Sequence, residues 1–325
     1  MIYEIKFLDD EHVILKDHIS GKGCNLPINE LLMSLNDGTP NNIDTILQDM
    51  LQVSVEYDQE HLRLLNKWIE NDWLGSLLFF LESNRVACVD IGENAKQNRQ
   101  KTINEYYGNV SNIPTDNITF TKEISLNDNH LKSGRNISSI LFKRRTKRRF
   151  SSAVMPFIEF EKIIVSGFNR IKKTRLAAKQ SSIGLLMSYG AAFDFYIAIY
   201  SVDGIEPGIY QYKPESNVLG LLHSGNFRND ISNILAQQVA PLNSCMTIFF
   251  ISNFNDYQFR YRHERALRNL YIEAGRIAQH LVISSEAMKY RTFVTPAIND
   301  QMAAQLFQLK DSSIQQALYS ITIGK

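Results

Sequence analysis

The chain lacks most of the features that mark secreted, membrane or metal-binding proteins. Its 325 residues include only three cysteines, Cys24, Cys88 and Cys245, whose spacing matches neither a disulfide framework nor a metal site. No apolar run approaches the ~18 residues that a membrane-spanning helix needs. The acidic, alternating N-terminus is unlike a signal peptide. These absences favour a protein of the reducing cytoplasm, with no membrane partner and no metal.

The chain also lacks a strong excess of either charge. Its formal net charge is +1, which gives no support for a nucleic-acid-binding protein. Hydrophobic residues make up 44% and charged residues 21%, as in an ordinary globular protein. A chain of 325 residues is long enough for two domains or one large one.

Residues 1–90 are expected to form a small α+β module of the winged-helix kind. Apolar residues alternate along residues 1–17, which predicts two short strands joined by a turn at Asp9–Glu11. Helical periodicity then follows at 26–35, 43–53 and 61–81, and a short strand pattern at 85–90. Because the helices are acidic or neutral, we interpret the module as a contact for a peptide or protein. The alternative is a purely structural cap on the larger domain.

Residues 91–136 are polar and rich in Asn, with turn chemistry at 112–117. They are interpreted as a linker or an arm that crosses the next domain. Residues 137–325 then alternate helical and strand patterns. Helices are expected at 157–168, 227–239, 262–287 and 301–309, a basic loop at 170–179, and strands at 195–202, 207–212, 217–222, 245–252 and 318–323.

The most unusual local feature is a cluster of cations at Leu141–Phe150. Six Lys and Arg residues lie within seven positions, between the apolar Leu141-Phe142 and Phe150. The like charges of such a cluster repel one another unless an anion neutralises them. Three interpretations compete: a solvated basic loop, a nucleic-acid or localisation patch, and a phosphate cradle built from Arg forks and a Thr hydroxyl. The flanking apolar anchors favour the cradle, because a disordered tail does not need them.

Three motifs resemble the nitroreductase-like flavoproteins. Arg144-Arg145-Thr146-x-Arg148-x-Phe150 is similar to that family's opening Arg-Arg-Ser-x-Arg-x-Phe. Met187-Ser188-Tyr189-Gly190-Ala191 is similar to its Pro-Ser-x-Gly-Ala, with Met for Pro, and the 204–212 run resembles the SagB-type peptide azoline dehydrogenases. The long helix from Tyr261 to Leu281 resembles a third motif, although Arg276 and His280 depart from it.

The resemblance implies a fold, a cofactor and a site. The fold would be the α+β nitroreductase-like FMN fold, with a central, mostly antiparallel sheet flanked by helices. The protein would be a homodimer with FMN at its interface. The cofactor-binding residues that it implies are Arg144, Arg145, Thr146 and Arg148 from one subunit, Ser188 and Gly190 from the other, Ala297 facing the flavin, and Lys325 near the phosphate.

The candidate catalytic residues are Tyr261 and Arg262. The azoline dehydrogenases have a Lys-Tyr pair here, and depending on a one-residue slip this chain offers Tyr261-Arg262 or Arg260-Tyr261. Arg stays charged and cannot act as a general base. This departure argues against azole-forming oxidation and leaves a reductive reaction open.

Three functions remain open. The first is an FMN-dependent oxidoreductase of a ribosomal peptide intermediate, by azoline dehydrogenation or dehydroamino-acid reduction, working with other peptide-modifying enzymes. The second is an NAD(P)H-dependent nitro or ene reductase of small molecules. The third is a flavin-free scaffold subunit of a peptide-modifying complex. The colour of the purified protein separates the third from the others.

Overall fold

A computed structural model of the chain forms two compact units. One comprises residues 1–93 with 263–265, and the other residues 94–262 with 266–325. The structure describes residues 3–18, 22–36, 70–71, 73–84, 94, 97, 101, 104–105, 120–127, 137–179, 184, 188–261, 263, 265–310 and 314–325. The expected helix at 43–53, the first part of the one at 61–81, and the strand at 85–90 lie outside these ranges.

The smaller unit contains a three-stranded antiparallel sheet in the order β1-β2-β3. Its elements are β1 (Tyr3–Phe7), β2 (His12–Asp17), β3 (Gly23–Pro27), α1 (Ile28–Asn36) and α4 (Leu74–Asn84). The expected hairpin is confirmed, and Asp9 Oδ1 closes its turn by accepting the Glu11 and His12 amides at 2.8 and 2.7 Å. Strand β3 was not expected, because five residues are too few to show a period.

The larger unit is built on a seven-stranded sheet in the order β4-β7-β6-β5-β8-β10-β9. Every neighbouring pair is antiparallel. The strands are β4 (Lys122–Ser125), β5 (Phe193–Ile199), β6 (Gly208–Lys213), β7 (Val218–Ser224), β8 (Met246–Asn253), β9 (Arg291–Thr295) and β10 (Gln315–Gly324). Strand β4 lies within the 91–136 segment and pairs with β7.

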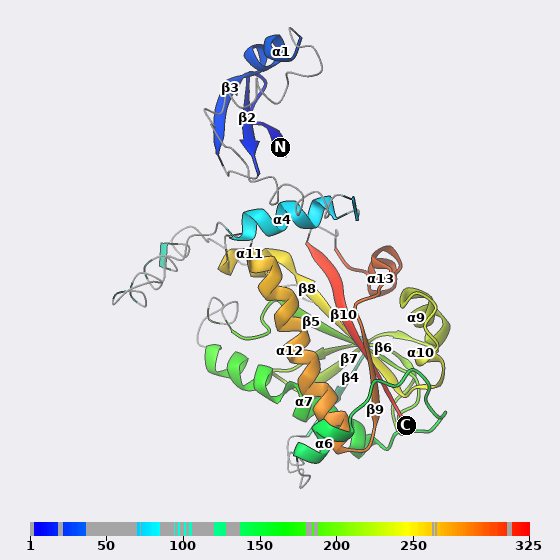
Figure 1. The fold of residues 1–325 in the computed structure, drawn as a ribbon. Helices are drawn as coiled ribbons and strands as arrows, with labels where there is room; N and C mark the ends of the chain where they lie inside the picture. The colour runs from blue at the N-terminus through cyan, green and yellow to red at the C-terminus, as the bar shows by residue number, and fades with distance from the viewer. Residues whose placement is uncertain are drawn as a thin grey trace. The chain divides into compact units, whose positions relative to one another are not determined.

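Helices cover both faces of this sheet (Figure 1). They are α6 (Ile137–Lys143), α7 (Phe157–Ala178), α9 (Arg228–Ile234), α10 (Ala240–Asn243), α11 (Phe254–Arg260), α12 (Arg265–Ala287) and α13 (Asp300–Phe307). The long helices α7 and α12 pack on one face, and α9 and α13 pack on the other. The expected fold class, an antiparallel sheet flanked by helices beside a small N-terminal sheet module, is confirmed.

The two covered faces explain why β8 has no polar alternation. Ile248 and Phe250 join the core under α7 and α12, whereas Phe249 and Ile251 join the core under α9 and α13. Successive side chains of a strand point to opposite faces, so both sets must be apolar here. The apolar run at 245–252 was therefore interpreted correctly as a strand buried on both faces.

Two expectations about helices were wrong. The basic loop expected at 170–179 is instead the last part of α7, because Ile171 and Arg175 are buried at helical spacing behind Phe168. The helix expected at 227–239 ends at Ile234, since Ala236 and Gln237 adopt φ angles of 53° and 61°. An α-helix cannot continue through left-handed residues.

Helices α7 and α12 approach closely at Gly167. A Cβ at this position would overlap Leu281 Cδ2 and lie 2.9 Å from Leu281 Cγ and 3.3 Å from Leu281 Cα. Only glycine permits this close contact between α7 and α12, which lie together on one face of the sheet.

Candidate functional site

The cationic stretch runs beside edge strand β9. The Lys147 amide donates to the Thr292 carbonyl at 3.0 Å, and Thr146 forms a parallel bridge with Thr292. Phe150 is buried beside Ala240 and Phe293. Of the apolar anchors that the sequence suggested, Phe150 is confirmed, whereas Leu141 and Phe142 are 52% and 81% exposed and anchor nothing among the described residues. Phe150 and the contacts with Thr292 hold this stretch against the sheet.

The arginines of this stretch occupy different positions. Arg145 Nη1 donates to the carbonyls of Phe142 and Arg144 at 3.0 and 2.8 Å, next to the C-terminus of α6. The Arg148 guanidinium lies 5.2 Å from the Phe293 ring centroid. Burial raises the pKa of Glu286, and the charges of Arg144 and Arg291 oppose that rise. Arg291 therefore joins this cationic region, although its isolated position in the sequence gave no signal.

Lys325 contacts Ser151, the residue that follows the cationic stretch. Its carbonyl accepts the Ser151 amide at 2.5 Å and the Ser151 hydroxyl at 3.0 Å. Its ammonium lies 3.7 Å from Glu159 Oε2 and 4.8 Å from the Tyr290 ring centroid. Lys325 is thus close to the cations but already has an acidic partner.

Ser188 and Gly190 form the turn before β5, and the polar backbone atoms of Gly190 are engaged. Gly190 has a φ of 72°, which favours glycine. Its amide donates to Glu273 Oε1 at 2.6 Å, and its carbonyl accepts from Arg175 Nη2 at 2.6 Å. Ser188 is buried, and its carbonyl accepts the Ala191 amide at 3.2 Å. The turn is therefore held between α7 and α12.

A pocket of about 330 Å³ joins this turn to Tyr261. It is lined by Tyr189, Tyr257, Arg260, Tyr261, Asn269, Ile272, Glu273 and Arg276. Tyr261 caps α11, and its ring lies 4.9 Å from the Tyr257 ring and 4.7 Å from the Arg260 guanidinium. We take this pocket as the candidate active site, because it brings together two motifs that are more than 70 residues apart.

Sequence reasoning missed Tyr189 and Tyr257 as pocket residues. The Tyr189 ring lies between two cations, 4.9 Å from the Arg170 guanidinium and 5.4 Å from that of Arg276. Burial raises the pKa of Tyr189, with opposing contributions from Arg276 and Arg170. Burial also raises the pKa of Tyr257, and the Glu273 charge adds to that rise. Tyr189 stands inside the Ser188–Gly190 motif, and that position was the available signal.

Within one chain, the cationic stretch and the pocket lie at opposite ends of the sheet. Thr146 bridges β9 at Thr292, whose partner Ile323 pairs with Met246 at the start of β8. Gly190 leads into Phe193, which pairs with Ser252 near the end of β8. A single chain therefore does not bring the two groups into one site.

Neither remaining candidate, Ala297 or Arg262, is among the described residues that line the pocket or form the cationic stretch. The Ala297 amide donates to Thr295 Oγ1 at 3.0 Å, just beyond β9. Arg262 lies outside the described residues.

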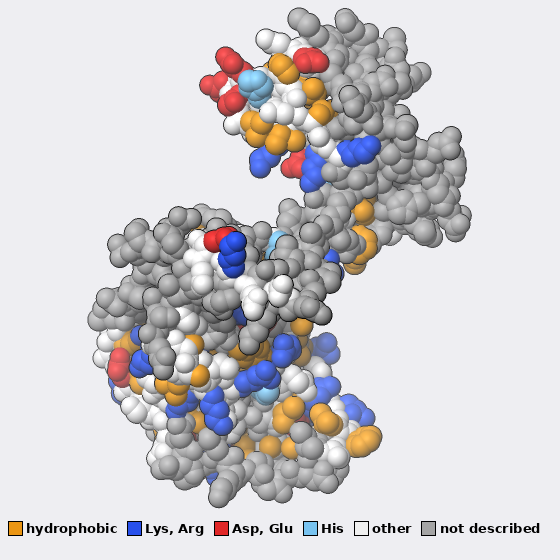
Figure 2. All heavy atoms as spheres, turned by 90° about the vertical axis from the view of Figure 1, so that its left-hand side faces the viewer, with side chains coloured by type: hydrophobic (Ala, Val, Ile, Leu, Met, Phe, Trp, Pro, Cys, Tyr) orange, Lys and Arg blue, Asp and Glu red, His pale blue; other side chains and the backbone are white. Residues whose placement is uncertain are grey.

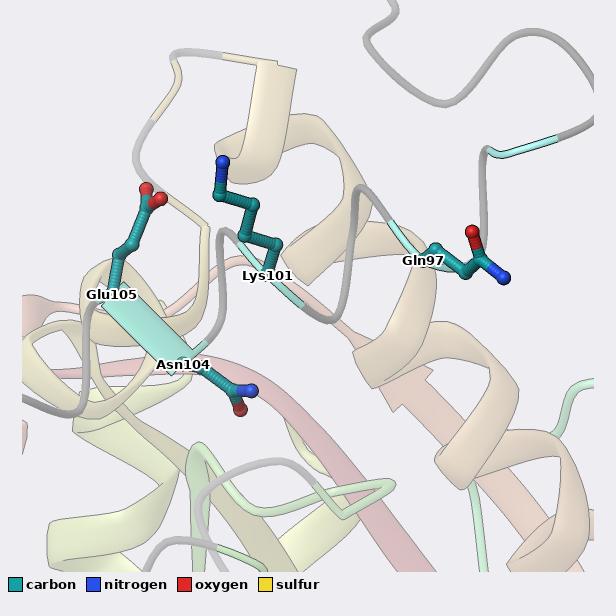
Figure 3. A pocket seen from close by; sticks show the side chains of 4 residues that line it. All are labelled: Gln97, Lys101, Asn104 and Glu105. Carbon is teal, nitrogen blue, oxygen red and sulfur yellow. The ribbon is translucent and has the colours of Figure 1, made fainter.

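A second hollow, of about 550 Å³, lies in the larger unit and is lined by Gln97, Lys101, Asn104 and Glu105. Their side chains do not converge on one point (Figure 3). Among the described residues no three His, Cys, Asp or Glu side chains cluster as metal ligands. No helix in those ranges is both long and apolar enough to cross a membrane.

The residues beside β9 fit the phosphate end of FMN better than the residues near Gly190 fit its ring. Arg145 and Arg148 are exposed, and neither has an acidic ion-pair partner among the described residues. Arg forks of this kind suit a terminal phosphate. The Gly190 and Ala297 amides, in contrast, already donate within the chain. Binding of the ring would therefore use side chains, or a rearrangement of these two turns.

Comparison with known proteins agrees with this architecture. The model of the Nitroreductase family matches residues 141–325, more than half of the chain. The chain is 24% identical over 194 residues to the trifolitoxin operon protein TfxC of Rhizobium leguminosarum bv. trifolii, which covers 57% of this chain and 54% of TfxC. It is 20% identical over 177 residues to the nitroreductase-type protein MJ1384 of Methanocaldococcus jannaschii, covering 54% of this chain and 85% of that protein.

A crystal structure of a nitroreductase-type protein from Anabaena variabilis has a similar fold. The TM-score is 0.53 at 18% identity, over 68% of this chain and 46% of that one. The chain thus spans about half the length of TfxC and of the Anabaena protein. The resemblance inferred from the motifs is confirmed, and the trifolitoxin operon relative supports its SagB-type branch. The chain belongs to the nitroreductase family.

Proposed function

We propose that the protein is an FMN-dependent oxidoreductase that acts on a ribosomal peptide intermediate, by azoline dehydrogenation or dehydroamino-acid reduction. The observation that carries this proposal is the pocket that sets Tyr261 beside the Ser188–Gly190 turn. The family supports oxidoreductase chemistry, and similarity to a trifolitoxin operon protein supports a peptide substrate.

Each candidate residue has a place in the proposal. Arg144, Arg145, Thr146 and Arg148 would hold the phosphate, with Lys325 near it. Ser188, Gly190 and Ala297 would approach the ring, the first two from the second subunit of a homodimer. FMN, when bound, supplies the hydride chemistry, while the protein supplies position and electrostatics.

Tyr261 is the proposed proton donor, and reduction is the favoured direction. A phenol hydroxyl donates a proton readily, whereas a neighbouring Arg260 or Arg262 stays charged and cannot accept one. Reduction of a carbon–carbon double bond needs such a donor at the carbon that does not receive the hydride. Oxidation would need a base, which this pair provides poorly.

The domain plan is part of the same proposal. Residues 1–90 would position the peptide, 91–136 would connect, and 137–325 would bind FMN, in a cytoplasmic dimer that works with other peptide-modifying enzymes. The edge strand β4 shows that at least part of the connecting segment packs on the larger sheet.

The test is the flavin content of the purified protein. We expect bound FMN and not FAD, because one cation cluster suits one terminal phosphate. We also expect light scattering to show a dimer. The double change Arg145→Ala and Arg148→Ala should weaken FMN binding by ~10²–10⁴-fold, since each charge-assisted bond contributes ~1.5–3 kcal/mol.

The matched control is Arg149→Ala, which removes one neighbouring exposed cation and should retain FMN. Full FMN occupancy in the double variant would contradict the phosphate cradle. A wild-type protein that neither carries nor takes up flavin would instead be a scaffold subunit. Turnover of nitro or ene compounds with NAD(P)H, without any peptide activity, would identify a small-molecule reductase.

A further inference from the structure

We propose that the pocket beside Tyr261 binds a carboxylate of the substrate, through the guanidiniums of Arg260 and Arg276 and the hydroxyl of Tyr189. The inference rests on the proposed function, because it takes this pocket as the substrate site. It adds the charge of the substrate, which neither the family nor the relatives specify.

The charge balance of the pocket is the first reason. Two guanidiniums and one carboxylate line it, and the carboxylate of Glu273 already accepts the Gly190 amide at 2.6 Å. Among the described residues, neither Arg260 nor Arg276 has an acidic side chain within ion-pairing distance. Two cations brought into one concave space favour an anion there.

The packing of the two cations against aromatic rings is the second reason. The Arg260 guanidinium lies 4.7 Å from the Tyr261 ring centroid, and that of Arg276 lies 5.4 Å from the Tyr189 ring centroid. A guanidinium next to an aromatic ring retains its N–H edges for a planar acceptor. Arg and carboxylate then pair through two parallel hydrogen bonds.

The Tyr189 hydroxyl is the third reason. Its oxygen is buried and has no hydrogen-bond partner among the described residues. A buried polar group without a partner is costly, and such groups are rare in native structures. Because burial raises the pKa of Tyr189, the hydroxyl keeps its proton at neutral pH and can donate a hydrogen bond to an anion.

The size and surroundings of the pocket agree with an organic acid. Its volume of about 330 Å³ lies at the lower end of the range for small-molecule sites. Three tyrosine rings and Ile272 supply apolar walls for the carbon skeleton. Figure 2 shows several Lys and Arg side chains on the face of the larger unit that it presents. Cations near a pocket help to steer an anion towards it.

Calorimetric titration of the full-length protein with benzoate, and with benzamide as its neutral isostere, tests the proposal. We expect benzoate to bind at least tenfold more tightly than benzamide. Arg260→Gln and Arg276→Gln should each weaken benzoate binding by about tenfold or more, as expected for one charge-assisted bond. Tyr189→Phe should weaken it severalfold.

The matched control is Arg268→Gln, which removes an exposed cation from the same helix as Arg276 and should change benzoate binding by less than about twofold. Arg276→Lys retains the charge and should retain part of the affinity. Circular dichroism establishes that each variant is folded. Benzoate that binds no better than benzamide, or that binds the two Gln variants as well as the wild type, overturns the proposal.

A third result also overturns it. If the two Gln variants lose FMN, and inorganic phosphate but not benzoate binds the wild type, the guanidiniums hold the flavin phosphate. Failure of the proposed function appears separately, as a wild-type protein without flavin, because the benzoate titration does not need the cofactor.

Discussion

Replacing Arg175 by Met preserves most of the side-chain length but removes a guanidinium from a buried junction. The Arg175 side chain is 10% exposed and lies 2.9 Å from Glu215 Oε1. Its Nη2 donates to the carbonyls of Gly190 and Phe193 at 2.6 and 2.8 Å. The change therefore removes the group that ties α7 to the turn beside the pocket.

We expect Arg175→Met to lower the free energy of unfolding by ~2–4 kcal/mol. Each buried acceptor that loses its donor costs ~1–3 kcal/mol. The Gly190 carbonyl still accepts the Phe193 amide at 3.1 Å, so the free-energy cost at this acceptor is at the lower end of that range. Glu215 is 32% exposed, and water screens its charge.

The wild-type junction is itself imperfect. Arg175 Nε and Glu215 Oε2 are buried without partners among the described residues. The expected loss of stability in Arg175→Met is therefore below the upper end of the ~3–5 kcal/mol that breaking a buried pair can cost. Glu215→Gln should cost less, and it should cost least when Arg175 is already Met, because the two residues are coupled.

Urea unfolding followed by near-ultraviolet circular dichroism provides the measurement. Tryptophan fluorescence is unsuitable, because both tryptophans, Trp68 and Trp73, belong to the smaller unit. Lys173→Met on the same helix is the matched control, since Lys173 is exposed, and should change stability by no more than ~0.5 kcal/mol. A loss below ~1 kcal/mol for Arg175→Met would refute the reasoning about unsatisfied acceptors.

Three further changes test other parts of the structure. Gly167→Ala should destabilise the larger unit by ~1–3 kcal/mol in thermal unfolding, because its Cβ would overlap Leu281; Gly275→Ala, where a Cβ meets nothing within 4 Å, should not. Arg228→Met should cost ~1–3 kcal/mol in urea, because Nη1 donates to two backbone carbonyls of α10 and to that of Ser244, which follows it; a change within experimental error would contradict that role. Tyr261→Phe should lower turnover ~10²–10⁴-fold with unchanged flavin content, as expected for a lost general acid; turnover within a few-fold of wild type would make Tyr261 structural.

Local patterns predicted those elements whose apolar pattern is complete within one continuous run of residues. The apolar run at 245–252 became β8, and the alternation before Asp9 became β1. In contrast, β9 (Arg291–Thr295) was missed, because five residues carry too little periodicity. The second part of α7 was missed because its cations hide the buried Ile171 and Arg175.

The sequence by itself determined the family and the two regions where chemistry was expected, because a cation cluster and a small-residue motif are contiguous in the chain. Only the tertiary structure decided how they are arranged. Strand register sets the cations and the Tyr261 pocket at opposite ends of one sheet. The α7–α12 packing brings Arg276 and Arg170 onto Tyr189. Such contacts join residues distant in sequence, so the pocket emerges only when the sheet and helices pack.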